Sequence, residues 1–342
     1  MSSGQRVLAL ALVVSAACRR APTSSPALPA PSAPAPAPVP QPPAPPPAPM
    51  VVPAPPWPSA GAFPVRDGRS QTQLTIAGEA RDVELFVPAR RDEHPPMVLL
   101  LHGTNGSGGQ VIDESGAERV AEAQGVVLVA PVARWRDGQY PDFDHPRAEE
   151  TYWETGPSHD PAQNHDLALV AQSLEAATQA FHPDPSRVFL AGHSNGAFFA
   201  LVVATVFRER FAAMALNAGG VVRCPTTASC HFRGRGTSCH ALRALPGWCP
   251  CAGPPLPVAV TAVAGWTLPT LLVHGTDDPL ISVQYACDLA DDLTRAGHPV
   301  RMSLRQGEGH VLAETFFRDA WAFFQGSRRA APAALVDTPT AR

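Results

Sequence analysis

The stretch that decides the fold is RVFLAGHSNGAFFAL, residues 187–201. The apolar run before Gly192 predicts a buried strand, and the apolar run after Gly196 predicts the start of a helix. Between them, Gly-x-Ser-x-Gly around Ser194 is typical of a sharp strand-to-helix turn with no room for side chains at its two ends. Such a turn exposes the serine hydroxyl and directs the first helical amides, including that of Asn195, toward it. We therefore predict that Ser194 is a nucleophile and that the N–H of Asn195 stabilises an oxyanion.

The sequence around this stretch predicts the α/β class. Continuous apolar runs, typical of parallel strands covered on both faces, occupy residues 97–101, 126–129, 188–190, 212–216 and 271–273. Helical patterns occupy residues 110–124, 165–181, 195–208, 282–296 and 311–325. Two alternating runs, 73–76 and 83–87, predict a hairpin before them. This alternation predicts a mainly parallel sheet covered on both faces, with its chemistry at the carboxyl ends of the strands.

Two further motifs follow strand-like runs, where that chemistry is expected. His274-Gly-x-x-Asp278 comes directly after one run, and His310 follows the last one. A histidine can accept the proton of a serine hydroxyl, and a carboxylate can hold that histidine in one tautomer. We therefore predict that His310 is the base and Asp278 the acid that act with Ser194.

From about residue 70 to 325, the chain resembles the α/β-hydrolase superfamily. The resemblance depends on four motifs at the ends of strands, namely His102-Gly103-Thr104, the serine turn, His274-Gly-x-x-Asp278 and Gly309-His310. Within that superfamily the chain is similar to secreted serine esterases related to polyhydroxyalkanoate depolymerases and to feruloyl or acetylxylan esterases. Those esterases commonly have Val-Pro where this chain has Ile281-Ser282.

The resemblance implies roles for individual residues. Ser194, Asp278 and His310 would form a catalytic triad, with the amides of Thr104 and Asn195 as the oxyanion hole. Ester cleavage would proceed through an acyl-enzyme and would need neither a cofactor nor a metal.

Other residues in these motifs admit other roles. Asp277 is the alternative acid, but Asp278 is preferred because it occupies the last place of the His-Gly-x-x-Asp motif. His102 and His274 are predicted to brace their turns and to take no part in the chemistry.

The N-terminal region has the features of an export signal and a spacer. Residues 1–18 combine one early arginine, an apolar run and small residues before Cys18, which resembles the lipidation motif of bacterial lipoproteins. Residues 19–60 are rich in proline and alanine and predict a disordered tether, about 120 Å long at about 3.1 Å per residue. The predicted protein is therefore exported and anchored to a bacterial membrane through a lipid on Cys18, with simple secretion as the alternative. The catalytic domain is placed at residues 61–327 and a disordered tail at 328–342.

Two insertions interrupt the strand and helix pattern. Residues 134–164 are rich in aromatic and acidic side chains, and Trp135 and Trp153 are predicted to flank the substrate, with a self-packed surface loop as the alternative. Residues 222–267 form a cysteine-rich insertion with the position of a lid. Six cysteines there and nearby are disulfide candidates, namely Cys224, Cys230, Cys239, Cys249, Cys251 and Cys287. A zinc cluster that uses His231 or His240 is the alternative, but an oxidising compartment favours disulfides.

Composition excludes a nucleic-acid partner, because the net charge is −4 and the basic residues are scattered. The predicted partner is an ester substrate outside the cell, with a short-chain or hydroxycinnamoyl acyl group or a polyester chain. A peptidase of the same fold and a non-catalytic surface binding protein are the alternatives.

Overall fold

The computed structural model describes residues 60–134, 151–155, 163–223, 230–250, 260 and 265–329. By internal contacts the chain divides into two units, Met1–Pro47 and Ala48–Arg342, and every described residue belongs to the second.

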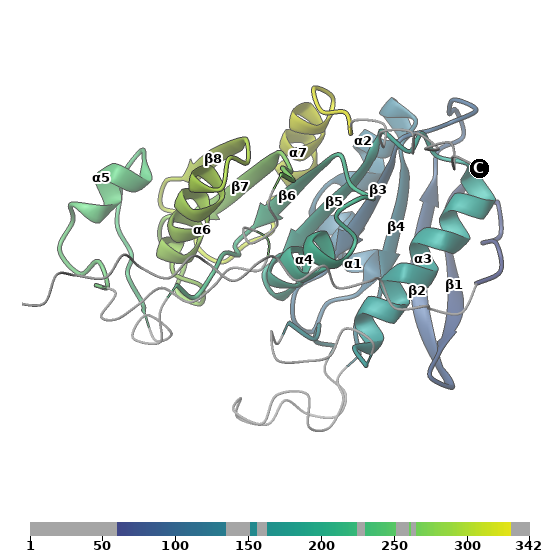
Figure 1. The fold of residues 1–342 in the computed structure, drawn as a ribbon, viewed down its shortest axis with the longest axis horizontal. Helices are drawn as coiled ribbons and strands as arrows, with labels where there is room; N and C mark the ends of the chain where they lie inside the picture. The colour runs from purple at the N-terminus through teal and green to yellow at the C-terminus, as the bar shows by residue number, and fades with distance from the viewer. Residues whose placement is uncertain are drawn as a thin grey trace, which may run out of the picture. The chain divides into compact units, whose positions relative to one another are not determined.

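One eight-stranded sheet forms the centre of this unit, in the order β1-β2-β4-β3-β5-β6-β7-β8 (Figure 1). The strands are β1 Gly68–Ile76, β2 Glu79–Val87, β3 Met97–Leu101, β4 Val127–Pro131, β5 Val188–His193, β6 Ala213–Asn217, β7 Thr270–Gly275 and β8 Val300–Arg305. β1 and β2 pair as an antiparallel hairpin, and β2 is also antiparallel to β4. All other pairs are parallel, which confirms the predicted mainly parallel α/β sheet.

The hairpin turns through only two residues. Ala77 and Gly78 have φ values of 50° and 86°, and Ile76 pairs directly with Glu79. Two consecutive positive φ values match the right-handed twist of the flanking strands. The predicted hairpin is therefore confirmed, with longer strands and a tighter turn than the alternating runs indicated.

Helices cover both faces of the sheet. They are α1 Gly108–Glu114, α2 Ala117–Gln124, α3 His165–Phe181, α4 Asn195–Val206, α6 Val283–Arg295 and α7 Phe316–Phe324, whereas α5 Cys239–Arg243 belongs to the cysteine-rich insertion. The helix predicted at 110–124 is two helices, because Gly116 has a φ of 70° and lies against the backbone of Glu314. The last helix begins later than predicted, and the carbonyl of Val311 instead accepts a hydrogen bond from the side chain of Asn217.

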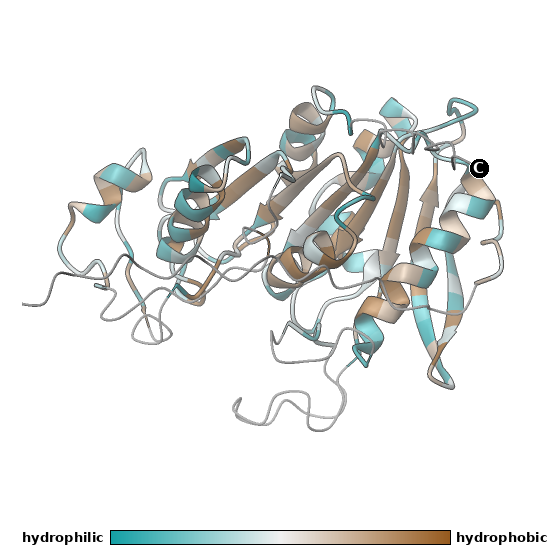
Figure 2. Ribbon diagram, in the orientation of Figure 1, coloured by the Kyte–Doolittle hydropathy of each residue, from teal (hydrophilic) through white to brown (hydrophobic). Residues whose placement is uncertain are grey.

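Alternate side chains of the central strands point to opposite faces. In β3, Met97, Leu99 and Leu101 face a cluster shared with α3, α4 and α6, whereas Val98 and Leu100 face a cluster shared with α1, α2 and α7. Figure 2 shows the central strands as almost uniformly apolar and α3 and α6 as mixed. Burial on both faces is the reason why these strands appear in the sequence as continuous apolar runs.

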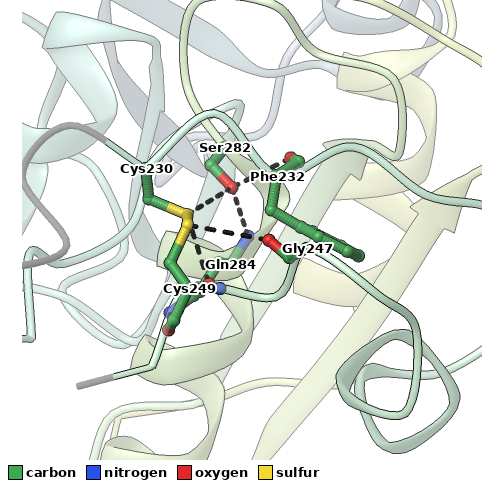
Figure 3. The surroundings of a disulfide bond; sticks show 6 residues. All are labelled: Cys230, Phe232, Gly247, Cys249, Ser282 and Gln284. Carbon is green, nitrogen blue, oxygen red and sulfur yellow. Dashed lines mark hydrogen bonds between the residues drawn. A yellow bond between two sulfur atoms is a disulfide. The ribbon is translucent and has the colours of Figure 1, made fainter.

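Two disulfides fix the described part of the cysteine-rich insertion. Cys230 bonds to Cys249, and Cys239 bonds to Cys287 on α6. For four cysteines the structure thus confirms the predicted disulfides and not the alternative zinc cluster. Cys224 and Cys251 lie outside the described residues. The buried side chain of Gln284 bonds to both backbone groups of Cys249, at 3.0 and 2.8 Å (Figure 3).

Candidate active site

The turn around Ser194 has the sharp geometry that the sequence predicted. Ser194 lies between β5 and α4 with φ 52° and ψ −122°, a conformation that costs a non-glycine residue about 1–3 kcal/mol. A Cβ on Gly192 would lie 2.4 Å from the carbonyl oxygen of Gly196. A Cβ on Gly196 would lie 2.3 Å from the carbonyl oxygen of His102. Both glycines are therefore required by close backbone contact, and the serine side chain stands free of its own helix.

Three residues from separate loops form one hydrogen-bonded chain. His310 Nε2 lies 2.8 Å from Ser194 Oγ, and His310 Nδ1 lies 2.7 Å from Asp278 Oδ2. Ser194 follows β5, Asp278 follows β7 and His310 follows β8, so all three stand at carboxyl ends of parallel strands. In the neutral imidazole, Nδ1–H donates to the carboxylate and Nε2 accepts from the serine hydroxyl. The structure thus brings together the three residues that the sequence selected.

Asp278 is held as a carboxylate by its surroundings. Burial alone would raise its pKa, but hydrogen bonds from His274, His310 and the backbone of Ile281 outweigh it and lower the pKa well below the usual range. Its second oxygen also accepts from the N–H of Leu280 at 2.9 Å. An acid that stays ionised at neutral pH can keep the proton of His310 on Nδ1.

Asp277, the alternative acid, does not contact the histidine. Its side chain is 58% exposed, and its nearest cation is Arg233, at 3.9 Å. Adjacent residues of one turn therefore point in different directions, one to His310 and one to the surface.

A cavity of about 370 Å³ opens beside Ser194 and His310. Its apolar lining consists of Val111, Leu280, Ile281 and Leu312, and its polar lining includes Thr104, Gln110, Glu114 and Tyr152. No described residue accepts a hydrogen bond from the backbone N–H of Thr104 or of Asn195. Thr104 lines the cavity and Asn195 follows Ser194 directly, and their role as oxyanion donors stays a prediction. No described residue of the cysteine-rich insertion lines this cavity, so its role as a lid stays a prediction.

Two histidines brace the loops that carry the site, as predicted. His102 is 1% exposed; its Nδ1 donates to the Gly103 carbonyl and its Nε2 accepts from the N–H of Ala133 at 3.0 Å. Burial lowers the pKa of His102 to about 4, so the ring is neutral. His274 Nε2 donates to the carbonyl of Ile281 at 2.9 Å and thereby supports the loop that carries Asp278.

His193 is a residue whose role the sequence did not reveal. Its ring centroid lies 5.2 Å from that of His310, and its Nδ1 accepts from the side-chain amide of Asn217 at 2.8 Å. Burial, with a smaller contribution from His310, lowers the pKa of His193 to about 4. His193 is therefore neutral at physiological pH and adds no positive charge beside the base. The only signal in the sequence was its place before Ser194.

Trp153 does not contact the substrate cavity, so that prediction is wrong. The side chain is fully buried, its Nε1 donates to the carbonyl of His102 at 2.8 Å, and its ring stacks on Phe199 at 4.9 Å. Its neighbour Tyr152 lines the cavity instead. Trp135 lies outside the described residues.

Neither a metal cluster nor a membrane-spanning helix is found within the part of the chain that the structure describes. No three His, Cys, Asp or Glu side chains there come together as metal ligands. None of its helices is long and apolar enough to cross a bilayer.

The sheet order, the strained serine turn and the Ser–His–Asp chain are those of the α/β-hydrolase class. Within that class, the chain belongs to the family described as "Putative esterase", which matches residues 75–332.

The chain is also similar, at low sequence identity, to individual proteins. "Putative esterase NocK" of Nocardia uniformis subsp. tsuyamanensis is 30% identical over 163 residues, 46% of this chain and 43% of that protein. "Bifunctional acetylxylan esterase/xylanase XynS20E" of Neocallimastix patriciarum is 22% identical over 207 residues, 60% of this chain and 23% of that protein. The chain thus spans less than half the length of either relative. The poly(3-hydroxybutyrate) depolymerase LpqC of Bordetella parapertussis superposes with a TM-score of 0.50 and 17% identity over 79% of this chain and 92% of that one, which shows a shared fold.

Proposed function

We propose that the protein hydrolyses carboxylic esters through an acyl-enzyme formed on Ser194. The observation that carries this proposal is the unbroken chain from Ser194 Oγ through His310 to Asp278, with contacts of 2.8 and 2.7 Å. Ser194 Oγ attacks the ester carbonyl carbon while His310 Nε2 takes the hydroxyl proton. The N–H groups of Thr104 and Asn195 stabilise the resulting oxyanion.

The rest of the cycle uses the same groups. The tetrahedral intermediate collapses, the bond to the alcohol oxygen breaks, and His310 returns its proton to the departing alcohol. A water molecule then attacks the acyl-enzyme with His310 as base, which releases the carboxylic acid and restores the Ser194 hydroxyl. The carboxylate of Asp278 stabilises the imidazolium formed in each half of the cycle.

Replacement of the nucleophile tests this proposal. Ser194→Ala should lower the turnover of 4-nitrophenyl acetate by several orders of magnitude, because triad members act as a unit. The matched control is Thr237→Ala, which removes an exposed hydroxyl of the cysteine-rich insertion and should leave turnover unchanged. Near-parental turnover by Ser194→Ala would rule out this nucleophile.

The volume of the cavity suits an acyl group of small-molecule size. Its volume of about 370 Å³ is at the low end of the roughly 300–1,000 Å³ found for small-molecule sites. The names of two similar proteins, which mention acetylxylan and poly(3-hydroxybutyrate), support an ester carried on a polymer as the substrate. The substrate class is therefore a short-chain or hydroxycinnamoyl ester or a polyester, met outside the cell.

A substrate panel separates this class from its rivals. Acetyl, butyryl, feruloyl, hydroxybutyrate-oligomer and palmitoyl esters should be compared with a peptide amide, and kcat/KM should be highest for one of the first four. Preference for palmitoyl would indicate a lipase, and preference for the amide a peptidase. No turnover of any substrate would favour a surface binding protein on a hydrolase scaffold.

The sequence of the N-terminal region supports a location of the enzyme at a membrane surface. Cys18 lies outside the described residues, but its small-residue motif and the following tether of 18 prolines between residues 21 and 60 suit a lipid-anchored enzyme held away from the bilayer. Cys18→Ser should move the protein from the membrane fraction to the soluble fraction or leave it unprocessed. Equal membrane partition of variant and parent would contradict the anchor.

A further inference from the structure

A short segment, residues 151–154, bonds to the loop that carries Thr104, and its last two residues are buried. The N–H of Asn105 donates to the carbonyl of Thr151 at 2.9 Å, and the hydroxyl of Thr151 donates to the carbonyl of Gly106 at 2.6 Å. The indole N–H of Trp153 donates to the carbonyl of His102 at 2.8 Å. These three bonds hold the loop on both sides of Thr104.

The same segment bonds to the first residue of α4. The N–H of Trp153 donates to Oδ1 of Asn195 at 2.6 Å, and Nδ2 of Asn195 lies 3.4 Å from the carbonyl of Trp153. The indole ring stacks on Phe199, one turn along α4, with an interplanar angle of 9°. One buried residue therefore contacts both elements that carry the oxyanion donors.

The far end of the segment is anchored in the core. The N–H of Glu154 donates to Asp166 at 2.8 Å, and Asn164 donates to the carbonyl of Glu154 at 3.2 Å. Asp166 and Asn164 lie at the buried N-terminus of α3, so the segment is fixed independently of the cavity.

An oxyanion hole needs such support because its two donors come from different elements. Asn195 begins a helix, whereas Thr104 lies in a loop where the next residue, Asn105, has a φ of 60°. Stabilisation of an oxyanion depends on donors held at about 2.7–3.1 Å from the developing charge. A misplacement of about 1 Å can cost on the order of 100-fold in rate.

We propose that Trp153, together with the hydroxyl of Thr151, positions the oxyanion hole and sets the separation of the Thr104 and Asn195 amides, with Trp153 acting through its indole N–H and its backbone. This inference rests on the proposed function, because it assigns a task within the same reaction. This role differs from that of a residue that contacts the substrate, because the ring of Trp153 is fully buried and affects the reaction by positioning the two donors.

Trp153→Phe tests the proposal because it removes the indole N–H and keeps most of the apolar ring. We expect kcat for 4-nitrophenyl acetate to fall about 10- to 100-fold, with KM within about twofold. Affinity for a short-chain trifluoromethyl ketone, which adds to serine as a tetrahedral oxyanion, should fall by the same factor as kcat. The pH profile of kcat/KM should not move, because the contacts of His310 are unchanged.

Trp321→Phe is the matched control. Trp321 is also buried, on α7, and its indole N–H donates to Gln124 at 3.2 Å. The Trp321→Phe variant should lose about as much stability as Trp153→Phe but should keep the kcat of the parent. Equal kcat effects in the two variants, or a change confined to KM, would overturn the proposal.

A second variant covers the possibility that Trp153→Phe folds poorly. Thr151→Val removes only the hydroxyl bond to Gly106 and should lower kcat and ketone affinity together. Parental values for both quantities would overturn the proposal. Failure of the proposed function is distinguishable, because the parent would then hydrolyse no ester and form no adduct with the ketone.

Discussion

The buried ion pair between Arg81 on β2 and Asp166 on α3 should contribute strongly to stability. Both side chains are 1% exposed, and Arg81 Nη2 lies 2.6 Å from Asp166 Oδ1. The same nitrogen donates to the carbonyl of Val132 at 3.0 Å. Two further buried nitrogens of Arg81, Nε and Nη1, have no partner among the described residues. Asp166 is therefore the counter-ion of a guanidinium that has little other support.

Asp166→Asn keeps the size of the side chain and removes its charge. Removal of one member of a buried pair costs about 3–5 kcal/mol, because the other charge stays buried without compensation. For a domain of this size, about 2–4 °C of melting temperature is lost per kcal/mol. The expected decrease in melting temperature is therefore about 6–20 °C.

Urea unfolding at pH 7, with the disulfides intact, measures this cost. The matched control is Asp67→Asn, which removes the partner of Arg91 at 2.8 Å in a pair whose side chains are 60% and 25% exposed. That exposed pair should contribute less than about 1 kcal/mol. The double variant Arg81→Met/Asp166→Leu should recover much of the loss, because it leaves no unpaired charge. A loss below about 1 kcal/mol in Asp166→Asn would refute the reasoning.

Three other predictions follow from the site. Asp278→Asn should lower kcat at least 100-fold more than Asp277→Asn in aryl-ester assays, because only Asp278 contacts the base; the opposite ranking would move the acid. His102 and His193 have pKa values of about 4 when folded and about 6.5 when unfolded, so the unfolded state binds protons first as the pH falls. The free energy of unfolding should drop by about 2 kcal/mol per histidine between pH 6.5 and 5, and urea midpoints independent of pH would contradict this. Glu114 lines the cavity, so Glu114→Gln should raise kcat/KM about fivefold for an aryl hemisuccinate relative to its neutral methyl ester; an unchanged ratio would exclude this charge effect.

The sequence by itself determined the fold class and most of the reacting groups. Ser194, Asp278 and His310 were recognisable because each lies in a short motif at the end of an apolar run, where a parallel sheet places its ligands. Gly192 and Gly196 were recognisable from the Gly-x-Ser-x-Gly motif, and the close backbone contacts in the structure explain why no side chain fits at either position. Signals of this kind are local, since they come from strand burial and from turns of a few residues.

Only the tertiary structure decided how side chains distant in sequence meet. An aromatic-rich loop predicts a substrate surface about as well as a self-packed surface loop, and neither pattern predicts that Trp153 lies buried against Phe199. Likewise, six cysteines allow 15 pairings, and the placement of the insertion against α6 selected the bond between Cys239 and Cys287. The pair of Arg81 and Asp166 joins residues 85 positions apart. The direction of a side chain and its contacts with residues distant in sequence depend on how the helices pack on the sheet. No local pattern of residues encodes that geometry.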